Sequence, residues 1–246
     1  MMTLPPSVIL SWGPIASLKS SFAAGFPGPI GWHSFDTGGF QRARIPEGQD
    51  ITVYEYPAPV RLEMAKKRHH LEGFVELWSE FLTNLSKDLK SDKQTIVIDT
   101  GTRCWLACHR AYLQDAQSRD PSKEGLIQVE YGEVNPWMFQ ILDATKLAGK
   151  NLVLTAHDEE ERMDVTVNGK KESVVLMEDN QPVMKPAGFR HLAKNADLVL
   201  HMTVEKNESW GTIDKSGLVT MKLGGARIKN PSYPKLLEVL ERAQEL

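Results

Sequence analysis

The sequence has little cysteine, no long apolar run and no large excess of charge of either sign. Its 2 cysteines among 246 residues are too few for a disulfide scaffold and fit a reducing cytosol, so we expect a cytoplasmic protein. No run of about 18 apolar residues is present, so we expect no transmembrane helix and no membrane partner. Met1 to Leu10 has neither a basic segment nor a small-residue cleavage site, so we expect no secretion signal. A net charge of −3 gives no global attraction to nucleic acid, so binding to DNA or RNA would need a local basic patch.

What the sequence does contain is a regular alternation of short β-branched runs with longer helical patterns. A hydrophobic fraction of 41% and a charged fraction of 25% are typical of a globular chain with a substantial core. Strand–helix alternation predicts an α/β fold with a mostly parallel central sheet flanked by helices. We interpret residues 1–246 as a single domain with a mobile excursion at about 158–186.

The predicted elements follow from these patterns. The strands of the parallel sheet are predicted at Ser7–Trp12, Ile30–Phe35, Ile51–Tyr54, Thr95–Asp99 and Asn151–Ala156. The helices are predicted at Lys19–Ala24, Arg61–Leu89, Cys104–Gln117, Pro136–Leu147 and Pro234–Gln244. Later segments predict antiparallel strands toward the C-terminus, namely a hairpin of Met163–Val167 and Glu172–Met177 around Asn168-Gly169, and strands at Asp197–Val204 and Leu218–Leu223.

The segment between the first strand and the first helix resembles a phosphate-binding loop. From Gly13 to Ser20 its frame is G-x-x-x-x-L-K-S, one residue away from the P-loop pattern G-x-x-x-x-G-K-[ST]. Backbone N–H groups and a helix N-terminus form an anion site there, while Lys19 would reach the β and γ phosphates and Ser20 would ligate Mg²⁺. The residues predicted to bind the nucleotide are Gly13, Pro14, Ile15, Ala16, Ser17, Leu18, Lys19, Ser20 and Ser21.

Leu18 departs from the pattern, which has glycine at this position. Glycine lets the backbone approach the phosphates and adopt unusual dihedral angles. Leu18 would fit if its φ is negative and its side chain points away from the nucleotide. The alternative is a turn that resembles a P-loop by chance.

Asp99 is the second candidate, because it follows four β-strand residues and ends a buried strand. In P-loop enzymes an aspartate at this place holds Mg²⁺ through water, opposite the P-loop Ser or Thr. Thr100 follows it, next to the expected water shell. The alternative is that Asp99 only caps the following helix. Ligands of open α/β sheets bind at the carboxyl ends of the strands, where both motifs lie.

With both motifs in place, the chain resembles the RecA-type ATPase core. More narrowly, it is similar to short phage RecA-like nucleotide-binding proteins, some of which act in single-strand annealing and recombination. The resemblance runs from about residue 6 to residue 235, so we expect no N-terminal polymerisation domain, as in the short phage forms. The stretches that carry it are Val8–Ser21, Phe35–Gly39, Thr95–Thr100, Tyr131–Asn135, Asn151–Arg162 and Asn195–Leu200.

The resemblance implies a RecA-like P-loop NTPase core that binds ATP and Mg²⁺, acts on single-stranded DNA and forms a homo-oligomer, in the host cytoplasm if a phage encodes it. It implies a catalytic base after the second strand, where Asp36 is the acidic candidate and Thr37 stands in the place of a catalytic Glu. It implies that His157 senses the γ-phosphate and that the loop opened by Asp158–Arg162 faces DNA. The basic residues implied to reach a neighbour's nucleotide are Lys222, Arg227 and Lys229.

Other interpretations remain open at this stage. Because of Leu18 and Thr37, the chain is also consistent with a nucleotide-binding module that has lost or weakened hydrolysis and acts through protein partners. A small-molecule phosphotransferase is a third interpretation, which the late antiparallel strands disfavour. Cys104 and Cys108 share a helix face, but no second ligand pair lies near them, so we expect buried small residues and no zinc site. The basic run Lys66–His70 predicts a solvated face, with nucleic-acid contact as the alternative.

Overall fold

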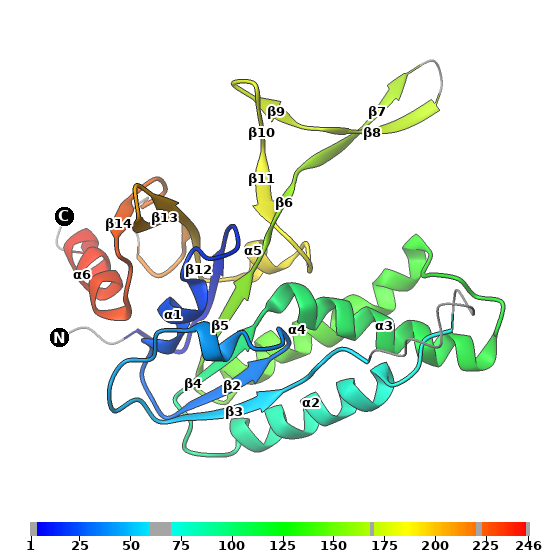
Figure 1. Cartoon of the computed structure of the whole chain (residues 1–246), viewed down its shortest axis with the longest axis horizontal. Helices are drawn as coiled ribbons and strands as arrows, with labels where there is room; N and C mark the ends of the chain where they lie inside the picture. The colour runs from blue at the N-terminus through cyan, green and yellow to red at the C-terminus, as the bar shows by residue number, and fades with distance from the viewer. Residues whose placement is uncertain (1–3, 60–69, 168–169, 220–222, 245–246) are drawn as a thin grey trace.

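A central eight-stranded sheet organises the computed structural model, which describes residues 4–59, 70–167, 170–219 and 223–244. Its strands are β1 (Val8–Trp12), β2 (Ile30–Ser34), β3 (Ile51–Glu55), β4 (Thr95–Asp99), β5 (Asn151–Ala156), β12 (Leu198–Glu205), β13 (Glu208–Ser216) and β14 (Arg227–Lys229). They lie in the order β14-β13-β12-β1-β5-β4-β2-β3 (Figure 1). The six strands from β12 to β3 are parallel, and β13 pairs antiparallel with both β12 and β14. The predicted α/β fold, with a mostly parallel central sheet and antiparallel strands toward the C-terminus, is therefore confirmed.

The apolar runs of the central strands fill two cores, one on each face of the sheet. Successive strand residues point to opposite faces, so an unbroken apolar run suits a strand that is covered on both sides. In β4, Ile96 and Ile98 pack into one core and Val97 into the other. The same alternation places Leu152 and Val153 of β5 on opposite faces.

The helices complete these two layers. On one face lie α2 (Phe74–Leu89), α3 (Gly101–Arg119), α4 (Tyr131–Leu147) and the short α5 (Leu192–Asn195), and on the other α1 (Lys19–Ala24) and α6 (Tyr233–Gln244) (Figure 1). Two 3-10 turns, Phe40–Arg42 and Gln128–Glu130, lie between elements. No helix in the described part of the chain has both the length and the apolar character needed to cross a membrane.

The predicted excursion at residues 158–186 forms a two-stranded arm that projects from the carboxyl edge of the sheet (Figure 1). Its strands are β6 (Asp158–Glu160), β7 (Arg162–Val167), β8 (Lys170–Val175), β9 (Met177–Glu178), β10 (Gln181–Pro182) and β11 (Met184–Pro186). β6 pairs with β11, β7 with β8 and β9 with β10, all antiparallel. The arm contains eight acidic and four basic residues, so its charge is net negative.

Three predicted elements have different bounds in the structure. Of the predicted helix Arg61–Leu89, residues 61–69 lie outside the described part. α2 begins only at Phe74 because Gly73 has a left-handed φ of 82°. α4 begins at Tyr131 and contains Pro136 in its interior, since burial of Val134 anchors an earlier turn. The predicted strand Leu218–Leu223 is wrong: residues 218 and 219 form a bend and 220–222 lie outside the described part.

Sequence reasoning missed two strands of the central sheet, the edge strand β14 and its neighbour β13. The reason is clearest for β13. Its buried residues include Ser209 and Gly211, which are too small or too polar to give an apolar signal. They are buried because β13 is paired on both sides, with β12 and with β14. The expectation for the cysteines is confirmed, since Cys104 and Cys108 are free and buried in the α3 side of the core.

Candidate nucleotide-binding site

The predicted site residues meet in a cleft at the carboxyl ends of β1, β4 and β5. The loop from Gly13 to Leu18 joins β1 to α1, and β5 lies between β1 and β4 in the sheet. The cleft has a volume of about 460 Å³. Its lining consists of Ile15, Ala16, Ser17, Leu18, Lys19, Ser20, Ser21, Asp36, Gly39, Arg42, Asp99, Thr100, Arg103 and His157. The structure thus brings together the P-loop residues from Ile15 to Ser21, both predicted carboxylates and His157, whereas Gly13 and Pro14 are not part of the lining.

The loop has an unusual backbone that two non-glycine residues adopt. Gly13 has a φ of 144°, and a Cβ atom there would lie 2.1 Å from the carbonyl oxygen of Met202 on β12. Ala16 and Leu18 have φ angles of 65° and 64°. The condition that Leu18 takes a negative φ is therefore wrong: it keeps the left-handed conformation that glycine would adopt at this position. A side chain there makes this conformation strained.

Lys19 is buried inside the loop that it follows. Its Nζ atom donates hydrogen bonds to the carbonyl oxygens of Gly13, at 2.9 Å, and Pro14, at 2.6 Å, and to the hydroxyl of Ser17, at 3.1 Å. Burial lowers the pKa of Lys19, while the nearby charges of Asp158 and Asp99 raise it. The three bonds hold the loop closed around the ammonium group, which lies at the base of the cleft.

Asp99 and Ser20 present oxygen atoms suited to Mg²⁺. Asp99 is 1% exposed, and its Oδ1 accepts a 2.5 Å hydrogen bond from the hydroxyl of Thr155 on β5. Its Oδ2 is buried and has no hydrogen-bond partner in the described part of the chain. Burial raises the pKa of Asp99, and the hydroxyl groups of Thr155 and Ser20 oppose that rise. Mg²⁺ prefers such hard oxygen donors and retains several waters, so an unpartnered buried carboxylate oxygen beside a serine hydroxyl fits the ion.

The helix cap at this point belongs to Thr100 and not to Asp99. Thr100 is the N-cap of α3, and its side chain accepts a hydrogen bond from the backbone N–H of Arg103 at 3.2 Å. The alternative interpretation of Asp99 as a cap is therefore wrong. Its carboxylate does not cap the helix, and its Oδ2 atom is available to a ligand in the cleft.

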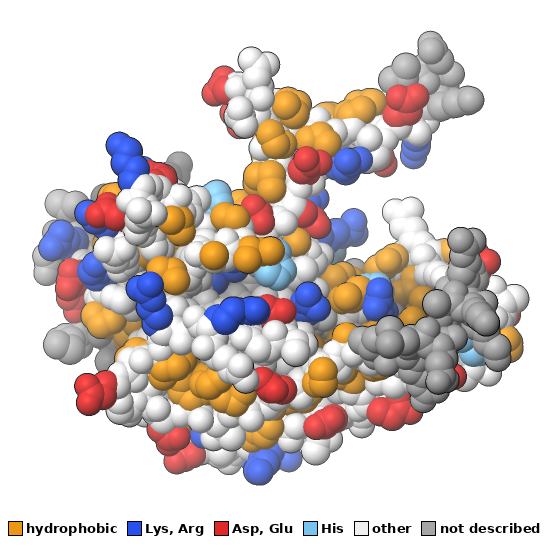
Figure 2. All heavy atoms as spheres, in the orientation of Figure 1, with side chains coloured by type: hydrophobic (Ala, Val, Ile, Leu, Met, Phe, Trp, Pro, Cys, Tyr) orange, Lys and Arg blue, Asp and Glu red, His pale blue; other side chains and the backbone are white. Residues whose placement is uncertain are grey.

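Asp36 lines the cleft but is engaged by two arginines. Its Oδ2 lies 3.0 Å from Nη2 of Arg42, and its Oδ1 lies 3.5 Å from Nε of Arg103. Figure 2 shows cationic and acidic side chains side by side across the middle of this face, below the arm. Thr37, by contrast, is exposed and is not part of the lining. Sequence reasoning did not select either arginine, although Arg103 lies in the first turn of the helix after Asp99, a position that could have been inspected.

His157 connects the cleft to the arm. Burial and then the charge of Lys19 lower the pKa of His157, so its imidazole is neutral at pH 7, and its Nδ1 is buried without a partner among the described residues. The hydroxyl of Thr102 accepts a hydrogen bond from the His157 N–H and donates one to the carbonyl oxygen of Ala187, both at 3.0 Å. The N–H of Ala187 in turn donates to the His157 carbonyl oxygen at 2.8 Å. Both ends of the arm are therefore held at one point of α3.

The residues predicted to act on a neighbour lie apart from the cleft. Arg227 and Lys229 are on the edge strand β14, where Arg227 pairs with Glu205 at 2.5 Å and Lys229 with Glu208 at 2.7 Å. The guanidinium of Arg227 also lies 4.5 Å from the ring centroid of Trp210. Lys222 is outside the described residues.

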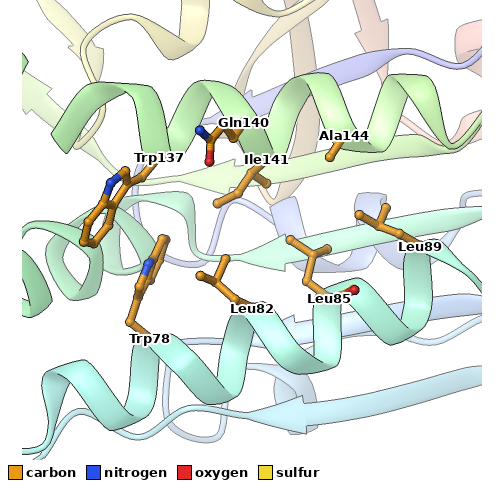
Figure 3. A pocket seen from close by; sticks show the side chains of 9 residues that line it. Trp78, Leu82, Leu85, Leu89, Trp137, Gln140, Ile141 and Ala144 are labelled. Atoms are coloured by element: carbon orange, nitrogen blue, oxygen red, sulfur yellow. The ribbon is translucent and has the colours of Figure 1, made fainter. Parts of the chain in front are cut away.

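A second hollow lies between α2 and α4 and is apolar. It has a volume of about 410 Å³, and its lining includes Trp78, Leu82, Trp137 and Ile141 (Figure 3). The rings of Trp78 and Trp137 are stacked with centroids 6.2 Å apart. This lining has none of the charged groups that a nucleotide needs. Across the described residues, no cluster of three or more His, Cys, Asp or Glu side chains forms a metal site.

Comparisons with known proteins found one family model and several solved structures that are similar to this chain. The model of the AAA domain family matches residues 8–229. A KaiC-like protein from the hyperthermophilic archaeon Pyrococcus horikoshii has a similar solved structure, with 13% identity, a TM-score of 0.47, and coverage of 91% of this chain and 84% of that chain. The RadB recombinase is similar at 12% identity, with a TM-score of 0.48 and coverage of 92% and 87%. No curated protein matches the chain.

The strained loop gives a first prediction, on stability. Ala16 is exposed and has a φ of 65°, so Ala16→Gly removes a Cβ atom that disfavours this backbone. We expect the free energy of unfolding to rise by about 0.5–1 kcal/mol, measured by denaturant titration without nucleotide. Ala148 is equally exposed but has a φ of −75°, so Ala148→Gly should lower the stability by a similar amount. A loss of stability in Ala16→Gly would contradict the left-handed conformation.

Buried Asp99 gives a second prediction, on pH dependence. Because its folded-state pKa is raised above 3.8, its ionisation opposes folding at neutral pH. We expect Asp99→Asn to raise Tm at pH 7 in Mg²⁺-free buffer, and the gain to disappear below pH 3.8, where the carboxyl group is protonated in both states. Asp197→Asn is the control and should lower Tm at pH 7, since Asp197 pairs with Lys146 at 2.8 Å. A lower Tm for Asp99→Asn at pH 7 would refute the desolvation argument.

Proposed function

The chain belongs to the AAA domain family, and from this premise we propose that it binds ATP with Mg²⁺ in the cleft and hydrolyses the γ-phosphate. The observation that carries the proposal is the meeting of Lys19 and Asp99 in one cleft, although 80 residues separate them along the chain. A cationic P-loop residue and a carboxylate with one unpartnered oxygen are complementary to a metal-bound triphosphate. Together they explain why two charged groups are buried at this edge.

The residues of the cleft divide the work of binding. The backbone N–H groups between Gly13 and Ser20 would hold the phosphates, and Lys19 would exchange its carbonyl partners for phosphate oxygens. Ser20 and Asp99 would hold Mg²⁺, the latter through water. The bound ion would neutralise charge that develops on the phosphate oxygens.

Asp36 and His157 are the groups that serve hydrolysis. A water molecule attacks the γ-phosphorus atom, the bond from that atom to the β–γ bridging oxygen breaks, and ADP leaves with the electron pair. Asp36 accepts the proton of the attacking water as the phosphate forms. His157 has a neutral ring, and donates a hydrogen bond to a γ-phosphate oxygen or to the water.

Single-stranded DNA is the partner that we propose for this ATPase, in recombination or annealing of the phage type. The sequence resemblance supports this partner, and the arm supports a coupling, because His157 and both ends of the arm share Thr102. Four acidic residues, 158–161, form the root of the arm, so they would repel a phosphate backbone. We therefore place the contact with DNA on the hairpin beyond Glu161, whose described residues include Arg162 and Lys171.

We also propose that the protein assembles as a homo-oligomer. Arg227 and Lys229 support this assembly, since the edge strand β14 presents them far from their own P-loop in the sheet order. In an assembly, one of them would reach the triphosphate of a neighbouring copy and stabilise charge in the transition state.

A second candidate function is a nucleotide-binding module without turnover that acts through protein partners. The ion pairs of Asp36 with Arg42 and Arg103 favour it, because both carboxylate oxygens that would take the proton of the water are engaged by cations. Leu18 also favours it, because it is strained and stands where the P-loop pattern has glycine. ATP binding without phosphate release would distinguish this candidate from the ATPase.

Lys19→Ala tests the nucleotide site. Loss of a charged hydrogen-bond donor should lower ATP affinity by about 10- to 100-fold and abolish phosphate release. Isothermal titration and a steady-state assay with and without single-stranded DNA give both readouts. Lys87→Ala, an exposed lysine on α2, is the control and should leave both unchanged. Unchanged ATP affinity in a folded Lys19→Ala protein would remove the P-loop assignment.

Thr102→Val tests the coupling to the arm. The substitution keeps the shape of the side chain but removes the hydroxyl that bonds both His157 and Ala187. We expect ATP affinity to stay within about twofold of wild type, while stimulation of hydrolysis by single-stranded DNA is lost. Thr83→Val is the matched control, because its hydroxyl bonds only Ser79 on its own helix. Full DNA stimulation in Thr102→Val would exclude this route, and no stimulation of wild type would exclude DNA as the partner.

A further inference from the structure

The backbone of Asp36 is fixed at the cleft, although its side chain is free to change partners. The N–H groups of Phe35 and Asp36 donate to the Asp99 carbonyl oxygen at 2.6 and 3.3 Å. The Asp36 carbonyl oxygen accepts from Ser34 Oγ at 3.1 Å and from the Gly39 N–H at 2.8 Å. These bonds tie the end of β2 to the end of β4. The carboxylate therefore stays beside the metal-binding edge whichever group it pairs with.

The two arginines that pair with this carboxylate are not fixed in this way, because their side chains are exposed. Arg42 is 69% exposed and Arg103 is 49% exposed, while the Asp36 side chain is only 24% exposed. Long, half-solvated guanidinium groups can be redirected at small energetic cost, since exposed ion pairs are weak. Both arginines also line the cleft that contains Lys19 and Asp99. A polyanion in the cleft would thus meet two cations whose present partner is a single carboxylate.

We propose that Arg42 and Arg103 recognise the terminal phosphate of a nucleoside triphosphate by exchanging Asp36 for it. Without nucleotide, Asp36 occupies both arginines. When a triphosphate binds, its γ-phosphate takes them, because a phosphate offers more negative charge and more acceptor oxygens than a carboxylate and matches the planar guanidinium group. A diphosphate leaves the ion pairs in place.

This inference rests on the proposed nucleotide site and adds to it a way to distinguish ATP from ADP within one chain. It also reconciles the base role of Asp36 with its ion pairs. The carboxylate is released only when the phosphate to be cleaved is present, so the base and the substrate arrive together.

The test is the ratio of ADP to ATP dissociation constants, measured by titration calorimetry with Mg²⁺ present. We expect Arg103→Ala, and Arg42→Ala to a smaller extent, to weaken ATP binding by about 10- to 100-fold and to leave ADP binding within about twofold. Asp36→Asn removes the competitor and should strengthen ATP binding relative to ADP. In the Arg42→Ala, Arg103→Ala double variant, Asp36→Asn should no longer change the ratio, as a double-mutant cycle requires.

Controls separate this exchange from general effects of charge. Arg119→Ala removes a surface arginine that pairs with Asp115 at 2.8 Å, as Arg103 pairs with Asp36, and should leave the ratio unchanged. Arg103→Lys keeps the charge but removes the planar guanidinium group, and should lose part of the preference for ATP. Arg42 and Arg103 are exposed enough for the variants to fold, which thermal unfolding verifies.

The outcomes distinguish a failure of the proposed arginine exchange from a failure of the proposed nucleotide site. Wild-type protein that binds both nucleotides, with an unchanged ratio in Arg103→Ala and in the double variant, overturns the exchange and leaves the nucleotide site standing. Equal gains in ATP and ADP affinity for Asp36→Asn also overturn it, because they would reflect only the loss of a negative charge. Wild-type protein that binds neither nucleotide overturns both the site and the exchange.

Discussion

The parallel pairing of β1, β5 and β4 is the constraint on which the rest of the structure depends. β5 lies between the two functional strands, with Ser11 of β1 in register with Thr155 and Ile98 of β4 in register with Leu154. The hydroxyl of Thr155 then donates a hydrogen bond to Asp99, the last residue of β4. Because parallel strands end at the same edge, this register sets the carboxylate opposite the loop that follows β1. A slip of one residue would turn these side chains to the other face of the sheet.

The chemistry of the edge comes at a cost in stability, which the two cores offset. Lys19 and Asp99 are both buried. Burial lowers the pKa of Lys19 and raises the pKa of Asp99, so it disfavours the charged form of each. Ala16 and Leu18 hold left-handed backbone angles that side chains disfavour. The cleft therefore carries both strain and desolvation, while the apolar strand residues on both faces supply compensating burial.

The arm and the apolar hollow show how differently two conspicuous features relate to the cleft. The arm starts directly after His157 and returns to Ala187, so a change at the cleft reaches it through a few hydrogen bonds. An isolated two-stranded arm is marginally stable alone, which makes it responsive to what its root contacts. The hollow between Trp78 and Trp137 belongs to the packing of α2 against α4, on a different part of the molecule.

Features that are encoded within a few residues can be predicted from the sequence. The runs at Val8–Trp12, Thr95–Asp99 and Asn151–Ala156 predicted the central strands, and the residues at their ends predicted the P-loop, Asp99 and His157 as one site. Local patterns suffice there, because a strand buried on both faces must be apolar throughout. Binding and catalytic roles for these residues remain proposals.

The remaining features depend on contacts between groups that are far apart in the chain. The start of α2 after Gly73 is stabilised by Gln114 of α3, whose side-chain oxygen accepts from the Phe74 N–H at 2.7 Å. β13 is a strand because two neighbours pair with it, although two of its buried residues, Ser209 and Gly211, give no apolar signal. The partners of Asp36 likewise come from a 3-10 turn and from α3, 67 residues away. No local pattern carries such contacts, since their free energy arises when the folded chain brings the two groups together.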